Sequence, residues 1–600
     1  MKMKKLTLLM VFFAFGYTNY AQLFIKDGSY IYNTDQVVFV KQDVNLETNS
    51  NFYLRNQAQL VQGKTGTSTN MGDGKLSVYQ EGTSNAFVYN YWCSPVGIAS
   101  VSAGNTDFGI LLMNRPTSVT NSSVITTTTY DGSTSNSTLA VAKHWIWKYI
   151  TANGYNPGGP NGWIHVQDTQ TLQPGQGFTM KGVTGTDATL ISSEAIQANN
   201  IGDNQRYDFR GRPNDGDISV DVDVSDYTLT GNPYPSALNV SAFLLAGSSS
   251  NCTGIAYYWE QDKTDSSHYV TDYHGGYGAF SPVSLVSNGI YVPATFDTYN
   301  GNGTLNTTGS SSGLVIERKY APIGQGFMIE GNALGSVVLK NGYREYIKEG
   351  SGLSQFERNV SIQNTTATSS QVPHLRFDIS LNNLNTRQLG LILIPEATDL
   401  VDSGIDAKSL ADDNLPNDVY FFLDNNKYVI EGVPFDVNKR VKIGVKSVPN
   451  TSFNFKLSHV INFDQNQNVY VYDGLTQTYH DIKNGNYDVI LPGGIINDRF
   501  EITFTASALN TVENFEEHFA IYQNNDFQTL IIENNQLIDL QYVSLFDIGG
   551  KVVFQKEKLG ANSSYQFPTS SLSDGIYIVK LVASNNQSLS HKIIIKHSKK

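Results

Sequence analysis

Charged residues are scarce in this sequence. Only 16% of the 600 residues are Asp, Glu, Lys or Arg, and the formal net charge is −13. Binding to nucleic-acid phosphates requires clustered Lys and Arg side chains, and no such cluster occurs. We therefore expect no nucleic-acid partner, and an anionic membrane surface is disfavoured for the same reason.

Cysteine is nearly absent. The two cysteines, Cys93 and Cys252, lie far apart in dissimilar surroundings. A disulfide between them is chemically possible in an oxidising compartment, but we favour two buried free thiols. Neither has a companion His/Asn pattern that would indicate a nucleophile.

Long apolar runs are also missing after the first 21 residues. A membrane-spanning helix needs about 18 or more consecutive apolar residues, so we expect no transmembrane segment in the mature chain. Residues 1–21 predict a secretory signal peptide, because three lysines precede the apolar run Leu6 to Phe15 and Ala21 follows it. The expected destination is extracellular or the outer cell surface, by way of the periplasm.

Tyrosine, phenylalanine and glycine are abundant, with 34, 30 and 52 copies. This composition is typical of short strands and turns, and 600 residues are too many for one hydrophobic core. We therefore predict an all-β chain with several antiparallel β-sandwich domains in series. Within the first segment, residues 22–85, short apolar pieces recur every few residues between 36 and 62. They could form the rungs of a short β-solenoid or an ordinary antiparallel meander.

An internal sequence repeat indicates how the next region is organised. Residues 172–182 read LQPGQGFTMKG and residues 321–331 read APIGQGFMIEG. Each copy has a proline-containing opening upstream and an aromatic strand in between: openings at 91–97 and 230–236, aromatic strands at 144–149 and 255–260. The common order predicts duplicated β domains over 86–200 and 201–340. Each Gly-Gln-Gly reads as a turn before a strand, and a phosphate-binding loop would require a helix there.

Two further patterns occur in the part of the chain before the last segment, residues 22–510, which we call the passenger. Residues 217–225 alternate strictly, which predicts a half-buried strand with Val220, Val222 and Val224 on its inner face. From 341 to 510, short strands separated by Gly, Asn and Pro turns predict another β-sandwich.

Catalytic and metal-binding motifs are missing. No H-E-x-x-H occurs, and the ten histidines are mostly isolated, which removes the usual zinc hydrolase patterns. We expect no catalytic residue, no metal site and no cofactor, with calcium as the one candidate. Its possible oxygen ligands crowd one loop whose spacing matches no known calcium loop, and a solvated turn is favoured: Asp399, Asp402, Asp406, Asp412 and Asp413.

One cluster has the composition of a binding site. Trp259 is followed by a glycine-rich loop that carries His268, Tyr273 and His274. Flat aromatic rings cover the apolar faces of sugars, while His and Asp supply hydrogen bonds, so these four residues could line a glycan or peptide site. The alternative is a structural loop packed on its own β domain, which we favour.

The last segment, residues 511–600, carries three ordered blocks: LFDIGGKV at 545–552, LSDGIYIVK at 572–580 and HKIIIK at 591–596. Together they resemble the type A C-terminal sorting domain of the type IX (Por) secretion system of flavobacterial proteins, a compact β-sandwich. The resemblance assigns the sorting signal to residues within these blocks: Leu545, Asp547, Gly550, Gly575, Tyr577, Lys592 and Lys596. The turn from Asp547 to Lys551 has glycines where a hairpin needs positive φ, so folding and recognition residues overlap here.

This resemblance implies export in two steps. The signal peptide takes the chain to the periplasm, and an outer-membrane translocon then reads the folded sorting domain. The implied partners are this translocon, its C-terminal signal peptidase and surface lipopolysaccharide. The passenger also resembles large surface proteins of flavobacteria, a likeness that names no activity.

Two classes of function remain for the passenger. The first is a noncatalytic adhesion, matrix or glycan-binding protein with an extracellular glycan or protein ligand; it rests on architecture and on the missing motifs. The second is a secreted polysaccharide or peptide hydrolase. Its acid pair would leave no sequence signature, because carboxylates on different strands can converge.

Overall fold

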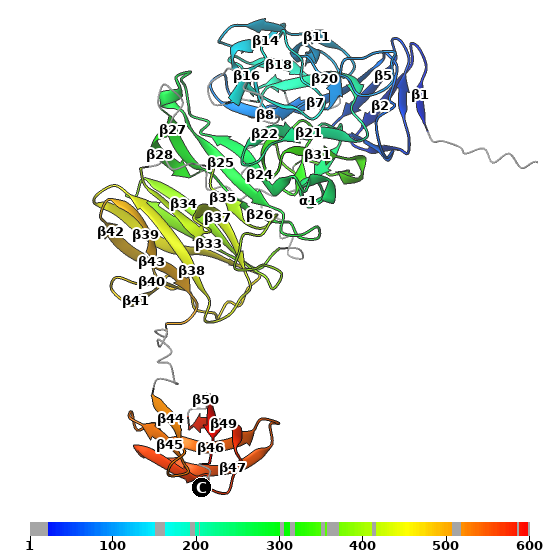
Figure 1. Cartoon of the computed structure of the whole chain (residues 1–600). Coiled ribbons are helices and arrows are strands. Elements are labelled where there is room, and N and C mark those ends of the chain that lie inside the picture. The colour runs from blue at the N-terminus through cyan, green and yellow to red at the C-terminus, as the bar shows by residue number, and fades with distance from the viewer. Residues whose placement is uncertain are drawn as a thin grey trace, which may run out of the picture. The chain divides into compact units, whose positions relative to one another are not determined.

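The computed structural model describes residues 22–150, 162–191, 198–202, 204–299, 305–311, 318–349, 354–356, 371–410, 416–506, 518–584 and 587–597. The expected signal peptide lies outside these residues. Strands dominate the described chain, and its one α-helix is α1 (Val240–Leu244). The all-β prediction is therefore confirmed. The chain forms two compact units, residues 1–505 and 506–600, each labelled in Figure 1.

The N-terminal segment is a short parallel β-solenoid. Three strands of one coil pair in parallel with three strands of the next. Leu23 pairs with Val44 and Tyr30 with Asn51, in each case 21 residues further along the chain, and Val37 pairs with Gln59, 22 residues further along. The coils are β1 (Leu23–Ile25), β2 (Tyr30–Thr34) and β3 (Val37–Val40), then β4 (Val44–Leu46), β5 (Asn51–Arg55) and β6 (Gln59–Gln62). Parallel pairing excludes the meander, because a meander pairs its strands antiparallel.

One sheet continues from this solenoid into the region beyond it. Strand β5 pairs with β7 (Lys75–Glu81), which pairs with β20 (Arg206–Pro213). The sheet then runs to β10 (Met113–Pro116) and β11 (Ser122–Val124). It thus joins strands from the segments 22–85, 86–200 and 201–340, and the passenger is one compact unit in which these segments share a sheet.

The duplicated landmarks correspond strand for strand. In the first copy β17 (Gly177–Lys181) lies between the opening strand β8 (Tyr89–Cys93) and the aromatic strand β15 (Trp147–Tyr149). In the second copy β30 (Gly326–Gly331) lies between β22 (Tyr227–Gly231) and β24 (Cys252–Gln261). The registers match too, because Gly177 pairs with Cys93 as Gly326 pairs with Gly231.

Each Gly-Gln-Gly turn packs against the opening strand of the other copy. The Thr230 hydroxyl donates to the Gly175 carbonyl oxygen over 2.7 Å, and the Cys93 amide donates to the Gly324 carbonyl oxygen over 2.8 Å. Gly175 and Gly324 have φ of +83° and +80°, which favours glycine at both positions. We call this reciprocal contact the turn clasp.

The clasp has no room for side chains at its closest points. A Cβ added at Gly177 would lie 2.6 Å from the Thr230 carbonyl oxygen, and one at Gly326 would lie 2.7 Å from the Trp92 nitrogen. Ile323, from the second turn, is buried in the hydrophobic core of the first copy. Both cysteines are buried free thiols, as favoured from the sequence.

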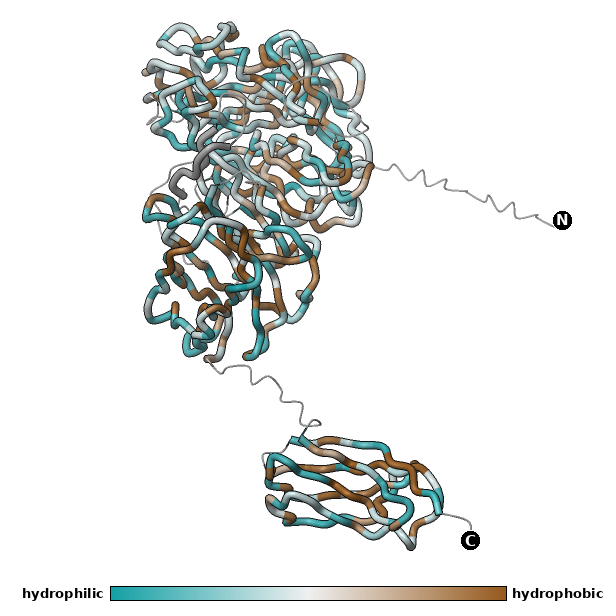
Figure 2. Tube along the Cα trace, turned by 60° about the vertical axis from the view of Figure 1, so that its left-hand side comes forward, coloured by the Kyte–Doolittle hydropathy of each residue, from teal (hydrophilic) through white to brown (hydrophobic). Residues whose placement is uncertain are grey.

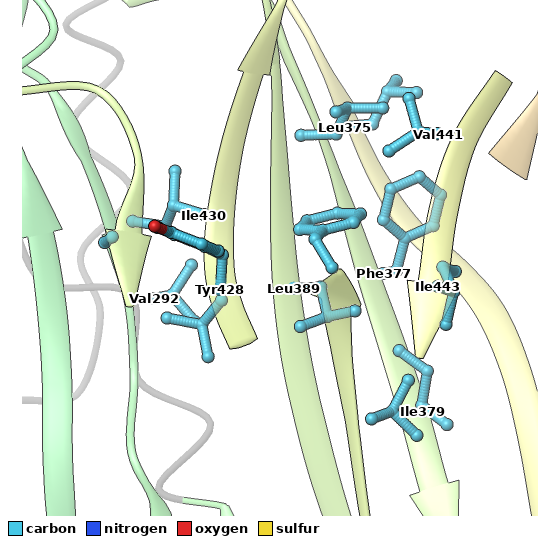
Figure 3. Close-up of a cluster of buried hydrophobic side chains, with 14 of the residues drawn as sticks. Val292, Leu375, Phe377, Ile379, Leu389, Tyr428, Ile430, Val441 and Ile443 are labelled. Carbon is cyan, nitrogen blue, oxygen red and sulfur yellow. The ribbon is translucent and has the colours of Figure 1, made fainter. Parts of the chain in front are cut away.

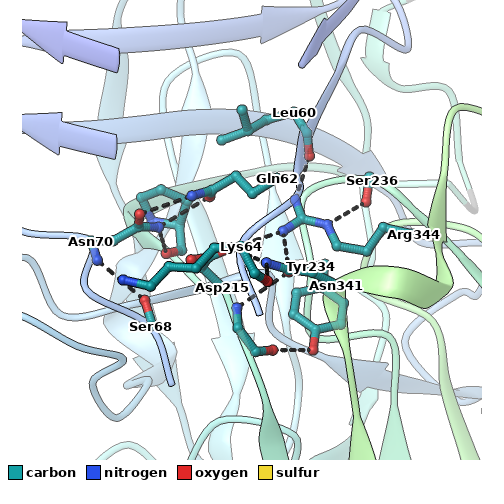
Figure 4. Close-up of polar contacts among 12 residues, drawn as sticks. Leu60, Gln62, Lys64, Ser68, Asn70, Asp215, Tyr234, Ser236, Asn341 and Arg344 are labelled. Carbon is teal, nitrogen blue, oxygen red and sulfur yellow. Dashed lines mark hydrogen bonds and ion pairs between the residues drawn. The ribbon is translucent and has the colours of Figure 1, made fainter. Parts of the chain in front are cut away.

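A buried polar network ties the solenoid to the second copy (Figure 4). The Arg344 guanidinium lies 3.4 Å from the Asp215 carboxylate, and both side chains are fully buried. Arg344 also donates to the Leu60 carbonyl oxygen of the solenoid and to the Ser236 hydroxyl. Burial lowers the pKa of Arg344 to about 10 and raises that of Asp215, and the attraction between the two charges opposes both shifts.

Residues 371–505 form an eleven-stranded sheet that curls around its own core. Phe455 and Phe500 lie on strands far apart in the sheet order, yet their ring centroids are 5.7 Å apart. Figure 3 shows Phe377 and Leu389 in this core with Ile443 nearby. The main strands are β33 (His374–Leu381), β34 (Asn385–Leu393), β36 (Asp418–Leu423), β37 (Asn426–Val433), β38 (Arg440–Ser447), β39 (Thr451–Ile461), β40 (Tyr470–Asp473), β41 (Thr478–Asp481), β42 (Tyr487–Leu491) and β43 (Gly494–Thr503).

Strand β21 (Ile218–Val222) shows the predicted alternation of buried and exposed residues. Val224, predicted on its inner face, is 58% exposed because the strand ends at Val222. This part of the prediction is wrong.

The second unit is a small β-sandwich with its own core. One sheet contains β44 (Phe519–Asn524), β45 (Thr529–Asn534) and β48 (Ser564–Pro568); the other contains β46 (Leu540–Asp547), β47 (Val552–Gly560), β49 (Gly575–Ala583) and β50 (Ser588–Ile595). Hydrophobic and hydrophilic residues alternate along these strands in Figure 2. The inward residues, including Leu530, Val543 and Leu581, form one buried cluster.

Replacing Arg344 by Met tests the buried network. The change leaves the Asp215 carboxylate buried without its counter-charge, and we expect the free energy of unfolding to fall by about 3–5 kcal/mol. Urea titration followed by tryptophan fluorescence measures it, since all five tryptophans lie before residue 505. The control is Lys348→Met, which breaks the exposed pair with Asp35. Equal shifts for both variants would show that the network does not join the segments.

Adding one methyl group tests the turn clasp. We expect Gly326→Ala to lower the free energy of unfolding by about 1–3 kcal/mol, because the new Cβ overlaps the backbone at Trp92. Gly342→Ala is the matched control, as a Cβ there meets nothing within 4 Å. Thermal unfolding monitored by circular dichroism compares the two, and an unchanged midpoint for Gly326→Ala contradicts the clasp.

Candidate functional site

A cavity of about 430 Å³ opens where the two copies meet. Its described lining is almost entirely aromatic and comes from both copies: Tyr89, Tyr91, His144, Trp145, Trp147, Trp163, Thr179, Trp259, Val270, Tyr273 and Tyr277. Four of the five tryptophans of the chain are among them. Several of the strands that supply them, β8, β16 (Trp163–His165), β24 and β25 (His274–Ser281), are labelled in Figure 1. We call this site the aromatic cavity.

The first wall follows from the alternation of side chains along strands. Tyr89 and Tyr91 lie two residues apart and face the cavity, while Trp92, the next residue after Tyr91, points to the other side of the strand and packs into the core of the first copy. Across the sheet, Thr179 is the direct partner of both Tyr91 and Trp147. Because the small threonine stands between two large rings, a hollow forms in the sheet face.

The second copy supplies the opposite wall. Trp259 stacks on Tyr91 with ring centroids 6.0 Å apart and planes 6° apart, and it pairs across the strands with Tyr277. The Tyr91 and Tyr277 hydroxyls are 2.7 Å apart. The site is therefore built by the contact between the copies and exists in neither copy alone.

A buried lysine stands behind this wall. The Lys181 ammonium lies 4.1 Å from the ring centroid of Trp145 and also faces the rings of Tyr89 and Tyr273. Desolvation lowers the pKa of Lys181 to about 7, against a weaker opposing effect from the charges of Asp265 and Asp131. Near neutral pH the amine is thus divided between its charged and neutral forms.

One histidine contacts this lysine, and two others pack on Trp145 and Trp147. The His268 Nδ1 lies 3.1 Å from the Lys181 Nζ, and its Nε2 lies 2.9 Å from an Asp131 carboxylate oxygen. The His268 ring stacks on Trp145, with 5.0 Å between centroids. His144 and His165 follow, with their centroids 5.3 Å apart.

Three of the four residues singled out from the sequence come together. Trp259 and Tyr273 line the aromatic cavity, and His268 lies directly behind its wall. His274 does not join them: its Nδ1 lies 2.9 Å from Asp265, and 47% of its side chain is exposed. Most lining residues were not predicted as a site, although the alternating aromatics of 89–91 and 145–147 were a usable signal.

In the acidic loop considered for calcium, two aspartates instead accept hydrogen bonds from nearby residues. Asp402 accepts hydrogen bonds from the amide and hydroxyl of Thr398, and Asp406 accepts from the amides of Asp402 and Gly432. Burial raises the pKa of Asp406 to about 7. Asp412 and Asp413 lie outside the described residues, and among the described ones no group of three or more His, Cys, Asp or Glu is placed to hold a metal ion.

A second cavity, of about 300 Å³, lies beside this loop. Glu330, Asp402, Asp406, Lys408 and Asp424 line it together with Tyr257 and Tyr428. The Lys408 ammonium forms a salt bridge with the Glu330 carboxylate, with 2.8 Å between Nζ and Oε1.

Five of the seven sorting-signal residues have clear roles in the fold of the second unit. Leu545 is fully buried, the Asp547 carboxylate accepts from the amides of Gly549 and Lys551, and Gly550 has a φ of +81°. Gly575 begins β49, and the Tyr577 hydroxyl donates to the Ser573 carbonyl oxygen. Lys592 and Lys596 are instead exposed on and just after the last strand.

The tail defines the class of protein. Residues 520–596 match the family described as "Secretion system C-terminal sorting domain", so the chain is a type IX secretion substrate, exported to the extracellular or cell-surface space. The family of the chain is given by its passenger. Residues 15–504 match the family described as "Domain of unknown function (DUF8693)", and the chain belongs to this family. In the described part of the chain no helix is long and apolar enough to cross a membrane.

Solved structures resemble the chain only remotely. A polysaccharide lyase is 10% identical, with 40% of this chain and 42% of that chain covered and a TM-score of 0.13. The BSP domain of a biofilm-associated protein is 10% identical, with 64% and 67% covered and a TM-score of 0.12. The 47-kilodalton lipoprotein of Treponema pallidum is 9% identical, with 62% and 92% covered and a TM-score of 0.12. No curated protein matches, and such low TM-scores carry no inference about function.

Deleting residues 511–600 should retain the passenger in the periplasm, because the sorting domain is the part that the secretion machinery reads. Cell fractionation and immunoblotting of the full and shortened chains measure this. A shortened chain that still reaches the surface or the medium normally would overturn the sorting assignment.

A second export prediction separates recognition from folding. We expect Lys592→Ala/Lys596→Ala to reduce export while leaving the unfolding midpoint of the chain unchanged, because both side chains are exposed. Lys556→Ala/Lys558→Ala removes two exposed lysines elsewhere in the same unit and is the matched control. An equal loss in both double variants would mean that total charge matters and the position does not.

Proposed function

We propose that the passenger is a noncatalytic glycan-binding protein that acts at the cell surface or in the surrounding medium, with the aromatic cavity as its binding site. The type IX route brings the cavity into contact with extracellular polymers. The implied removal of the sorting domain by its peptidase, and attachment of the passenger to surface lipopolysaccharide, belong to the same proposal.

The observation that carries this proposal is the concentration of aromatic rings. Four of five tryptophans and four tyrosines meet in one cavity, although the rest of the chain is poor in tryptophan. Rings of this kind cover the apolar faces of sugars, and the hydroxyls and imidazoles at their edges hydrogen-bond sugar hydroxyls. The volume of about 430 Å³ falls in the range of small-ligand sites, roughly 300–1,000 Å³.

An aromatic cage could also hold a quaternary ammonium ion through cation–π contacts. Lys181 argues against such a ligand. Its ammonium already faces Tyr89, Trp145 and Tyr273, so a second cation in the cavity would be repelled. A ligand without positive charge fits better.

A secreted hydrolase is the other function class expected from the sequence. Glycoside hydrolysis needs two carboxyl groups about 5–10 Å apart across the scissile bond. None of the eleven described lining residues is Asp or Glu. This composition supports binding without cleavage at the aromatic cavity.

Removing one ring tests the site. We expect Trp147→Ala and Trp163→Ala each to weaken glycan binding about tenfold or more, which corresponds to about 1.4 kcal/mol of lost stacking. Both side chains are only partly buried, so the fold should survive. The matched control is Tyr30→Ala, which removes a ring 65% exposed on the solenoid.

The measurement is a glycan array with the mature chain, followed by titration calorimetry on the best ligand. Failure to bind any glycan, or unchanged affinity in both tryptophan variants, would refute the proposal. Release of new reducing ends or unsaturated products from a bound glycan would instead establish an enzyme.

A further inference from the structure

The surroundings of the aromatic cavity are basic, in contrast to the acidic chain. His144 is one of the lining residues, and Lys181, His165 and His268 lie directly behind lining rings. The His165 ring stacks on Trp147 with 4.1 Å between centroids. We call these four residues the basic cluster. Four cationic or titratable basic groups thus meet at one cavity in a protein of net charge −13.

The members of the cluster oppose one another's charging. The pKa of His144 is lowered first by desolvation and then by the charges of His165, Lys181 and His268. The pKa of His268 is lowered by desolvation and by Lys181, although Asp131 opposes this. Such mutual repulsion is relieved when a negative charge enters the space that the groups share.

Two aspartates face the cluster, and both are engaged elsewhere. Asp131 contacts the His268 Nε2 from the solvent side, where its own side chain is 73% exposed. The Asp265 carboxylate accepts from Gln261 and from the His274 amide, and it contacts the His274 ring. The remaining neighbours of Lys181 are the neutral rings of Tyr89, Trp145 and Tyr273, and its Nζ donates a hydrogen bond to the Tyr273 hydroxyl over 2.5 Å. Neither carboxylate is among the described lining residues.

One ring nitrogen adds an independent observation. The His165 Nε2 is buried and has no hydrogen-bond partner, whereas its Nδ1 lies 3.1 Å from the Gln167 side-chain amide. A buried polar atom without a partner costs free energy, and it gains a partner when a ligand or water reaches it. This nitrogen belongs to the ring that stacks on Trp147, and Trp147 lines the aromatic cavity.

We propose that the aromatic cavity selects acidic glycans, with the carboxylate of a uronic acid residue held by the positive field of the basic cluster while the sugar ring stacks on tryptophan. The inference rests on the proposed glycan-binding function and adds the substrate class. It assigns Lys181 as the specificity-determining residue of the site.

Binding of a carboxylate stabilises the protonated forms of Lys181, His144 and His268 and raises their pKa values. Affinity for the acid therefore increases as the pH falls from 8 to 6, through the pKa of about 7 of Lys181. For one proton taken up, the change over this interval is about tenfold. A neutral glycan lacks this dependence, since it does not favour one protonation state.

The test uses the mature chain and oligosaccharides of galacturonic acid, glucuronic acid and mannuronic acid, each compared with its own methyl ester. The ester keeps the ring and its hydroxyls and removes only the charge. We expect at least one acid to bind tenfold or more tightly than its ester at pH 6, with the ratio falling at pH 8. A sulfated neutral oligosaccharide of equal length tests whether any anion suffices.

The outcomes separate the two proposals. Equal affinity for acid and ester, or a ratio that does not change with pH, overturns the acidic-glycan inference and leaves the glycan-binding function standing. Binding of the sulfated glycan alone also overturns it. If no glycan of any kind binds, the proposed function itself is refuted.

Lys181→Met provides the variant. A long apolar side chain keeps the packing among the rings and removes the charge, so we expect the acid-to-ester ratio to fall toward one while ester affinity is retained. Lys148→Met is the control, because the Lys148 Nζ donates to the side chain of Gln176, in the turn before β17, and Lys148 is not among the described lining residues of the cavity. Should Lys181→Met fail to fold, His268→Gln and the pH profile of the unaltered chain still decide the question.

Discussion

The passenger depends on a contact that only glycine backbone allows. Each Gly-Gln-Gly turn is held against the opening strand of the other copy, by a hydrogen bond at Gly175 in one direction and at Gly324 in the other. Side chains at Gly177 or Gly326 would enter backbone atoms of the partner strand. The reciprocity means that neither copy completes its own packing, and this is why Ile323 of the second copy is part of the core of the first.

The aromatic cavity is a consequence of the same contact. Because the clasp brings the two copies face to face, Tyr91 of one stacks on Trp259 of the other. The small Thr179 then leaves the hollow between their sheets. The same crowding buries Lys181 among rings, and burial makes its charge sensitive to pH near 7. Site geometry and site electrostatics therefore share one origin.

The C-terminal unit, in contrast, is stabilised by its own hydrophobic core. This unit, residues 506–600, has its own hydrophobic cluster, so it can present a sorting surface without help from the passenger core. Most of its signature residues are needed for folding: Asp547 closes a hairpin and Gly550 adopts a left-handed conformation. Only the exposed lysines of its last block are free to serve recognition alone, because their side chains do not pack in the core.

The sequence by itself determined the all-β class and the export route, and it displayed the repeated turns, because strand composition, ordered tail motifs and turn sequences are local properties. It also placed Trp259, His268 and Tyr273 near one another, since they are neighbours along the chain. It did not reveal that one sheet joins strands from three expected segments, with β7 beside β20, or that Val224 falls beyond a strand end. The tertiary structure alone decided that the aromatics of residues 89–163 meet those of residues 259–277, because that meeting depends on contacts between strands far apart in the chain.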